Sequence, residues 1–237
     1  MKLAVLDHLL SVGRSGTSIA LVTDFVSGAQ SLITSGNVDG ELTLNAKDLA
    51  EVRRALDDDQ SRLIQTQAGP VFVEVWNPRL RLIVVGAVHA AQTLVPLAKL
   101  AGYEVTVIDP RTAFGTAERF PSTTVLSVWP SEALDALKPD RRTAIVTLAH
   151  DPKIDDPALE KALRSEAFYV GALGSRRTHA KRAERLLQAG VDAAALARIR
   201  GPIGLAIGAL TPAEIAISIM AEITAVLRRA PLASRAG

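Results

Sequence analysis

The sequence contains no cysteine among its 237 residues. This absence excludes disulfides, thiolate metal sites, iron–sulfur clusters and a cysteine nucleophile. Aromatic residues make up only 4% of the chain, so a core must be built from Ala, Val, Leu and Ile. That composition suits a parallel sheet covered by helices. The chain has 27 Lys and Arg against 25 Asp and Glu, and this balance gives no indication of a nucleic-acid partner.

Long hydrophobic runs are also lacking. No apolar stretch reaches the roughly 18 residues that a membrane span requires. Near residues 2–12, Asp7 and His8 interrupt an apolar run, which predicts an amphipathic helix rather than a signal peptide. We therefore expect a soluble cytoplasmic protein without a membrane partner. No histidine pair has metal-ligand spacing and no serine lies in a nucleophile-elbow pattern, so neither a metal site nor a catalytic residue is predicted.

Two patterns meet at Asn77-Pro78, where the proline disfavours helix at the residue before it. Residues 1–77 mix short helix and strand signals, which predicts a small α+β N-terminal domain. Its predicted elements after the first helix are a hairpin over 18–36, a helix over 46–59 capped by Asn45, and strands over 61–67 and 70–76.

Residues 78–237 alternate nearly all-apolar strands with helices. This pattern predicts an α/β fold, a Rossmann-like parallel sheet buried on both faces by helices. Strands are predicted over 81–86, 104–109, 124–128, 143–149 and 167–174. Helices are predicted over 90–102, 131–137, 157–165 and 177–190, and a last one is opened by Thr211 with Pro212 in its first turn.

The stretch VVGAVHAAQ, residues 84–92, is similar to the phosphate-binding turn of a dinucleotide fold. In such a turn the first glycine allows a tight bend and the second lets pyrophosphate approach the backbone. Gly86 holds the first place, but Val88 holds the second, which argues against pyrophosphate crossing in the usual way. His89 opens the next helix, either as a ligand contact or as an ordinary polar residue at a helix end.

Asp109 ends the next predicted strand, about 20 residues on, where a ribose-binding acid is expected in a dinucleotide fold. Arg111 follows closely and is suited to a ribose 2′-phosphate. The Rossmann signal is therefore stronger than the signal for NAD(P), which stays a second candidate ligand.

Three further clusters follow predicted strands and should meet at one sheet edge. His150-Asp151 is either an acid–base pair or a helix entrance capped by the aspartate. Residues 171–177, GALGSRR, predict a phosphate site because a glycine-rich turn leads into a helix N-terminus that bears two arginines. The alternative places those arginines with Lys181 and Arg182 on a solvated face. The glycine-rich stretch 201–210 either approaches a ligand or only turns a corner.

Several blocks in order, among them RLIVVGAVHAAQ, FYVGALGSRRTHAKR and GPIGLAIGALTPAEIAISIMAEI, resemble the XdhC/CoxI family over residues 80–228. That resemblance implies an accessory protein that binds the molybdenum cofactor, as molybdopterin or its nucleotide form. It implies delivery to an apo molybdenum hydroxylase of the xanthine or carbon monoxide dehydrogenase type, with a cysteine desulfurase as a further partner. A homodimer is a further expectation, because the last helix is apolar on more than one face.

The chain departs from the family pattern at Val88, at Ala206, where the family commonly has aspartate, and at residues 27–29, where a cysteine-containing SGGC segment is absent. An NAD(P)-dependent oxidoreductase and a protein–protein adaptor remain the alternatives. The predicted cofactor-binding residues are Gly86, His89, Asp109, Arg111, His150, Asp151, Gly171, Gly174, Ser175, Arg176, Arg177 and Gly204.

Overall fold

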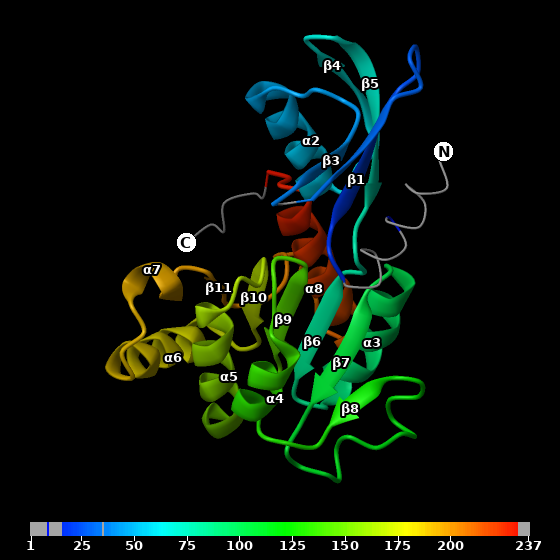
Figure 1. Ribbon diagram of the computed structural model, residues 1–237. Coiled ribbons are helices and arrows are strands. Elements are labelled where there is room, and N and C mark those ends of the chain that lie inside the picture. The colour runs from blue at the N-terminus through cyan, green and yellow to red at the C-terminus, as the bar shows by residue number, and fades with distance from the viewer. Residues whose placement is uncertain (1–8, 10–15, 35, 232–237) are drawn as a thin grey trace. The chain divides into compact units, whose positions relative to one another are not determined.

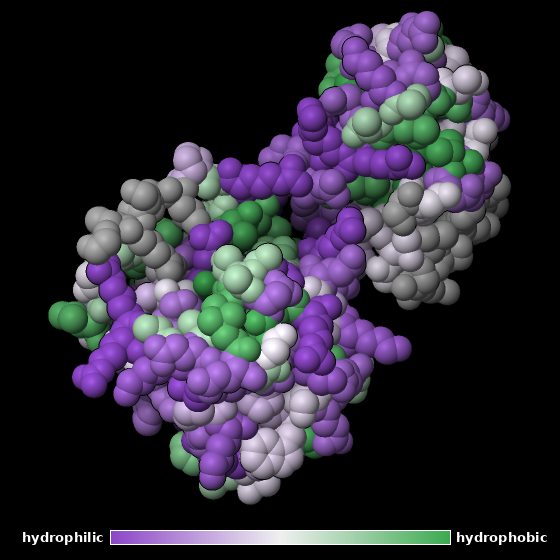
Figure 2. Space-filling model, turned by 90° about the vertical axis from the view of Figure 1, so that its left-hand side faces the viewer, coloured by the Kyte–Doolittle hydropathy of each residue, from purple (hydrophilic) through white to green (hydrophobic). Residues whose placement is uncertain are grey.

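The computed structural model describes residues 9, 16–34 and 36–231. They form two compact units, Met1–Pro78 and Arg79–Gly237. Apart from Leu9, the helix predicted near residues 2–12 lies outside the described residues. The described part of the chain contains no helix that is both long and apolar enough to cross a membrane. On the face drawn in Figure 2, hydrophilic residues surround smaller apolar areas.

The N-terminal unit is an antiparallel sheet covered by one helix (Figure 1). The sheet order is β3-β2-β1-β5-β4. Its strands are β1 (Ile19–Asp24), β2 (Gln30–Ile33), β3 (Val38–Gly40), β4 (Arg62–Thr66) and β5 (Gly69–Trp76). The predicted hairpin is confirmed by the antiparallel pairing of β1 with β2.

Helix α2 (Ala46–Asp58) begins where its cap predicts. Asn45 accepts the N–H of Asp48, and the Asp48 carboxylate reaches back to the N–H of Asn45, so two otherwise unpaired donors are satisfied. Val52 and Leu56 lie one turn apart and pack against β1 and β5, as the apolar spacing predicts.

The C-terminal unit is a six-stranded parallel sheet with helices on both faces (Figure 1). The strand order, read from the opposite edge, is β8-β7-β6-β9-β10-β11. This is the order of a doubly wound Rossmann sheet, in which the chain crosses between its first and fourth strands. The strands are β6 (Arg81–Val85), β7 (Glu104–Ile108), β8 (Thr124–Leu126), β9 (Thr143–Thr147), β10 (Tyr169–Ala172) and β11 (Ile199–Arg200).

Two helix layers bury the two faces of this sheet. Alternate residues of β6 decide which face they serve, since Leu82 and Val84 belong to one apolar cluster and Ile83 and Val85 to the other. The first cluster is covered by α3 (His89–Leu100) and α8 (Pro212–Leu227), and the second by α4 (Pro130–Leu137), α5 (Pro152–Arg164), α6 (Arg176–Gln188) and α7 (Ala193–Leu196). The predicted Rossmann-like fold is confirmed.

Candidate functional site

The turn after β6 is shaped by the approach of a second strand. Gly86 has φ +106°, and a Cβ at this position would lie 2.6 Å from the backbone nitrogen of Ala149, beyond the end of β9. A side chain is therefore excluded by backbone contact between β6 and β9, the point at which the strand order reverses. Val88 is half-buried at the N-cap of α3, and His89 is the exposed first residue of that helix.

Asp109, at the end of β7, is fully buried and joins this turn to the following loop. Its carboxylate accepts the N–H of Ala87 at 2.8 Å and holds the Arg111 guanidinium at 2.9 Å from Nε and 2.8 Å from Nη2. Burial alone would raise the pKa of Asp109, but the hydrogen bonds from Arg111 and Ala87 lower it below its usual value. A ribose hydroxyl would have to displace one of these donors to reach the carboxylate.

Arg111 remains one-third exposed after this pairing, with its guanidinium 4.3 Å from the ring centre of Phe114. The negative charges of Asp109, Asp151 and Asp155 all raise its pKa. Arg111 therefore belongs to the same charged edge of the sheet as the residues that follow β9.

His150 and Asp151 do not form a facing pair. His150 is exposed, with φ +59°, and it lines a cavity beyond the end of β9. Partial burial, with the charge of Arg182, lowers the pKa of His150. Asp151 caps α5 by accepting the N–H of Lys153 at 2.9 Å, as the helix-entrance alternative predicts.

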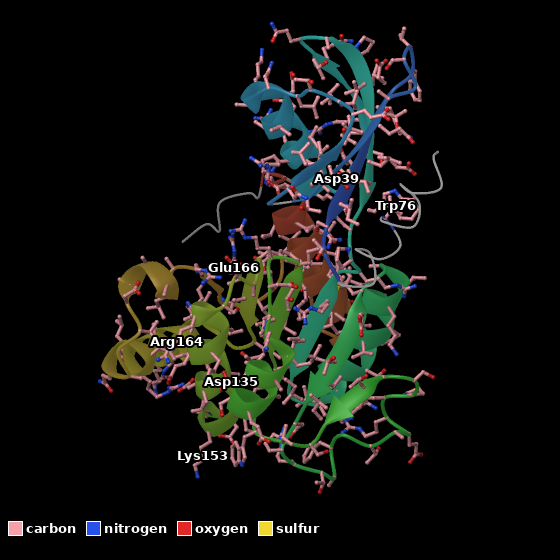
Figure 3. The ribbon with its side chains drawn as sticks, in the orientation of Figure 1. Asp39, Trp76, Asp135, Lys153, Arg164 and Glu166 are labelled. Atoms are coloured by element: carbon pink, nitrogen blue, oxygen red, sulfur yellow. The ribbon has the colours of Figure 1, made fainter. Side chains whose placement is uncertain are left out.

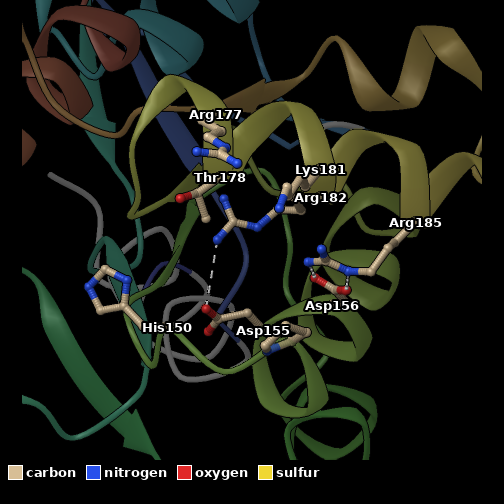
Figure 4. Close-up of a pocket in the computed structure, with 9 residues that line it drawn as sticks. His150, Asp155, Asp156, Arg177, Thr178, Lys181, Arg182 and Arg185 are labelled. Atoms are coloured by element: carbon tan, nitrogen blue, oxygen red, sulfur yellow. Dashed lines mark hydrogen bonds and ion pairs between the residues drawn. The ribbon is translucent and has the colours of Figure 1, made fainter.

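The cavity beyond β9 and β10 has a volume of about 250 Å³ and lies between α5 and α6 (Figure 4). At its buried side, Asp155 of α5 faces Arg182 of α6, and a carboxylate oxygen lies 3.8 Å from Nη2 of the guanidinium. We call it the Arg182 cavity. Its lining residues are His150, Pro152, Asp155, Asp156, Arg177, Thr178, Lys181, Arg182 and Arg185.

Asp155 and Arg182 are almost completely buried, at 1% and 2% exposure. Burial raises the pKa of Asp155 to about 6, against the lowering effects of Arg182 and of the backbone N–H groups of Ala149 and His150. Burial likewise lowers the pKa of Arg182. The alternative that placed Arg182 on a solvated face is therefore wrong.

A second cavity, of about 450 Å³, lies on the other side of the β10–α6 turn. We call it the glycine-loop cavity, because residues 202–209 form much of its wall, together with Gly174, Arg176 and the side of α8. Arg176 and Arg177 thus line different cavities, since neighbouring residues on a helix point about 100° apart. Within the described part of the chain, no three His, Asp or Glu side chains could together hold a metal ion.

The wall of the glycine-loop cavity is fixed by a buried glutamate of α8. Glu222 accepts the hydroxyl of Tyr169 at 2.6 Å and the N–H of Gly204 at 2.8 Å. Gly204 has φ +89°, and a Cβ there would lie 2.4 Å from Oγ of Ser218. Gly204 is therefore required by close packing of the loop on α8.

The remaining predicted residues of the β10–α6 turn have distinct positions. Gly171 is buried within β10, where a Cβ would lie 2.5 Å from the side chain of Ile203. Gly174 has φ +144° against Thr178. Ser175 caps α6 by accepting the N–H of Thr178 at 3.1 Å. Of these three, only Gly174 borders a cavity.

Sequence reasoning missed Asp155 and most of the charged wall around it, although spacing contains a signal. Arg182 lies four residues before the buried Leu186, and Asp155 lies among Ile154, Ala158 and Leu159 on the buried stripe of α5. A charged residue on an apolar stripe at helical spacing marks a buried charge. Together with His150 and Arg177, which were predicted, these residues form the Arg182 cavity.

The fold and its strand-end crevice define a Rossmann-type α/β domain with two cavities beside the turn that precedes α6. Residues 82–223 match the model of the XdhC Rossmann domain, which is more than half of the chain. The chain belongs to this family, and the predicted resemblance is confirmed.

Three curated relatives have sequence identities of 30% to 36%. They are the uncharacterized protein YqeB of Escherichia coli K12, at 36% over 166 residues, 68% of this chain and 30% of that protein; the molybdenum cofactor insertion chaperone PaoD of the same strain, at 30% over 151 residues, 64% and 41%; and a probable xanthine dehydrogenase subunit of Bacillus subtilis 168, at 32% over 167 residues, 69% and 48%. The chain spans less than half of the length of each of these relatives.

A solved structure, described as a xanthine dehydrogenase from Bacillus halodurans, matches nearly the whole chain. Its TM-score is 0.73 at 25% identity, and the match covers 95% of this chain and 67% of that one. The folds of both units therefore have counterparts in a solved structure.

Proposed function

We propose that this protein binds the molybdenum cofactor at the strand-end crevice of its C-terminal unit and delivers it to an apo molybdenum hydroxylase. Membership of the XdhC family and similarity to PaoD, which is named a molybdenum cofactor insertion chaperone, support this function. The single structural observation that carries it is the pair of cavities on either side of the β10–α6 turn, each containing one arginine of the predicted phosphate site.

The residues present fit an organic ligand that carries phosphate. The glycine-loop cavity, at about 450 Å³, falls within the range of pockets that hold small organic ligands. Its wall has small residues and backbone groups, with apolar Leu205 and Ile215 for a flat ring and Arg176 for an anion. The chain has no cysteine, so it offers no thiolate for molybdenum. We therefore assign the pterin part of the cofactor to the glycine-loop cavity, where this chain holds and orients it.

The alternative of an NAD(P)-dependent oxidoreductase finds less support. Val88 occupies the place of the second glycine, and Asp109 is buried under the guanidinium of Arg111. A dinucleotide at the β6–α3 turn would meet a branched side chain where pyrophosphate needs backbone contact. The hydroxylase, a cysteine desulfurase and a second copy of the chain remain proposed partners.

An anaerobic titration with isolated molybdenum cofactor and, separately, with NADPH tests this function. We expect the cofactor to bind and the variant Arg176→Ala, Arg177→Ala to lose most of that affinity. Arg164→Ala is the matched control, since Arg164 is an exposed arginine of α5 that borders neither cavity (Figure 3). Transfer is then measured as activation of an apo molybdenum hydroxylase by the loaded protein. Binding of NADPH alone, or cofactor binding that the double variant leaves unchanged, would contradict the proposal.

A further inference from the structure

Arg182 carries a buried positive charge that the described residues do not satisfy. Its Nη2 donates to the carbonyl of Leu173 at 3.0 Å, whereas Nε and Nη1 are buried and have no hydrogen-bond partner in the described part of the chain. The nearest Asp155 oxygen, at 3.8 Å, is beyond hydrogen-bond distance. Buried polar groups are rarely left without partners, because each unsatisfied donor retains the full cost of its desolvation.

The other charges of the Arg182 cavity leave this guanidinium short of negative charge. Asp156 is held by Arg185 at 2.6 Å and 3.1 Å, a two-point pair that uses both carboxylate oxygens. Asp155 is thus the only other acid among the lining residues, and it faces Arg177, Lys181 and Arg182 together. The cavity therefore has an excess of positive charge.

The cavity also lies at the N-terminal end of a long helix. Arg177 and Thr178 belong to the first turn of the 13-residue helix α6, whose N-terminus carries partial positive charge. At about 250 Å³ the space is smaller than the usual range for whole organic ligands. Its size and charge match a small multiply charged anion.

We propose that the Arg182 cavity binds a phosphate group, with Nε and Nη1 of Arg182 donating from the buried side and Arg177 and Lys181 contacting it from the exposed side. The group belongs either to the molybdenum cofactor, an identification that rests on the proposed function, or to a separate small phosphate compound. In both cases the phosphate supplies the acceptors that Arg182 lacks.

Calorimetric titration with inorganic pyrophosphate tests the site without the cofactor. We expect Arg177→Gln and Lys181→Gln each to weaken binding several-fold, and Arg182→Met to weaken it by about tenfold or more, the loss for a hydrogen bond to a charged group. Lys153→Gln is the matched control, because Lys153 is exposed at the start of α5 and outside the cavity (Figure 3). It removes the same charge nearby, and its affinity should stay within about twofold of wild type.

Arg182→Met could fail to fold, so its thermal transition is compared with that of the wild type. If it is unfolded, Arg177→Gln and Lys181→Gln decide the question, since both residues are exposed. No pyrophosphate binding by the wild type, or an equal loss in Lys153→Gln, would overturn the proposal. These results would leave cofactor binding, which is titrated separately, unaffected.

Competition identifies the source of the phosphate. If the cofactor supplies it, saturating pyrophosphate weakens cofactor binding, and Arg182→Met weakens both ligands. If a separate compound supplies it, pyrophosphate leaves cofactor affinity unchanged while its own binding still depends on Arg182. Both outcomes retain the phosphate site, and they differ in what the site recognises.

Discussion

Lowering the pH from 7.5 to 5.5 should strengthen anion binding in the Arg182 cavity. Asp155 has a pKa of about 6, raised by burial, so this change converts most of it from carboxylate to acid. The ionised carboxylate attracts Arg182 and repels an incoming anion, whereas the protonated acid does neither. Sulfate is the appropriate ligand, because it remains a dianion throughout this range and only the protein titrates.

The surroundings of Asp155 support this assignment. Arg182 faces it from α6, Asp156 is its neighbour on α5, and the charge of Arg111 reaches it from the loop after β7. Both arginines stay charged over this range. His150 lines the same cavity, and its lowered pKa means that its own protonation at low pH acts in the same direction. The titration is therefore repeated in a His150→Gln background.

The magnitude follows from the population of the binding-competent form. With a pKa of about 6, Asp155 is about 3% protonated at pH 7.5 and about 76% protonated at pH 5.5. If sulfate binds only when Asp155 is protonated, its apparent affinity should rise by about 25-fold across the range. Residual binding to the ionised form reduces this factor but does not change its sign.

Calorimetry at several pH values measures this dependence, with Asp155→Asn as the decisive variant. The amide keeps an oxygen for the N–H of Ala149, which now bonds the carboxylate at 3.2 Å, but cannot ionise. We expect its sulfate affinity at pH 7.5 to approach the wild-type value at pH 5.5 and to vary little with pH. A flat profile in the wild type, or an equally steep one in Asp155→Asn, would refute the reasoning.

Three further predictions concern stability, measured by urea unfolding. Gly86→Ala should destabilise the C-terminal unit by about 2–5 kcal/mol, because strain and a backbone clash combine, whereas Gly102→Ala, at φ +87° with open space around it, should cost only about 1–2 kcal/mol. Glu222→Leu should cost about 2–4 kcal/mol, since two donors lose their acceptor, and Glu222→Gln less than about 1 kcal/mol. The folded-state pKa of Asp155 is raised, so its contribution to stability should increase by up to about 3 kcal/mol as the pH falls from about 7 to 4, and Asp155→Asn should lose this slope.

Most of the C-terminal sheet could be predicted because each main strand is a nearly continuous apolar run. Strand β9 is buried along its whole length, and such a run between helices has few alternatives. Strand β11 and helix α7, with two and four residues, are too short to produce a periodic pattern. The predicted family resemblance fits the observed strand order, but pairing between β6 and β9 joins residues about 60 apart, which local patterns do not encode.

The site was less predictable than the fold. The basic stretch before α6 correctly indicated a cationic helix start, but not that Arg176 and Arg177 would line two different cavities. That division depends on residues 202–209, whose position is decided by Glu222 and α8. Arg182 was assigned to a solvated face because its neighbours are charged, although its spacing to Leu186 places it on the buried side.

Two buried carboxylates at the same sheet edge explain why the proposed ligand lies away from the dinucleotide turn. Asp109 has a lowered pKa and two-point contact with Arg111, so it holds the β6–α3 turn in one arrangement and offers no exposed oxygen. Asp155 has a raised pKa and only a long contact with Arg182, which leaves that guanidinium able to accept another partner. Val88 closes the first position, and the second remains chemically unsatisfied. In this chain, anion recognition at the Rossmann crevice has therefore moved from the turn before α3 to the space between α5 and α6.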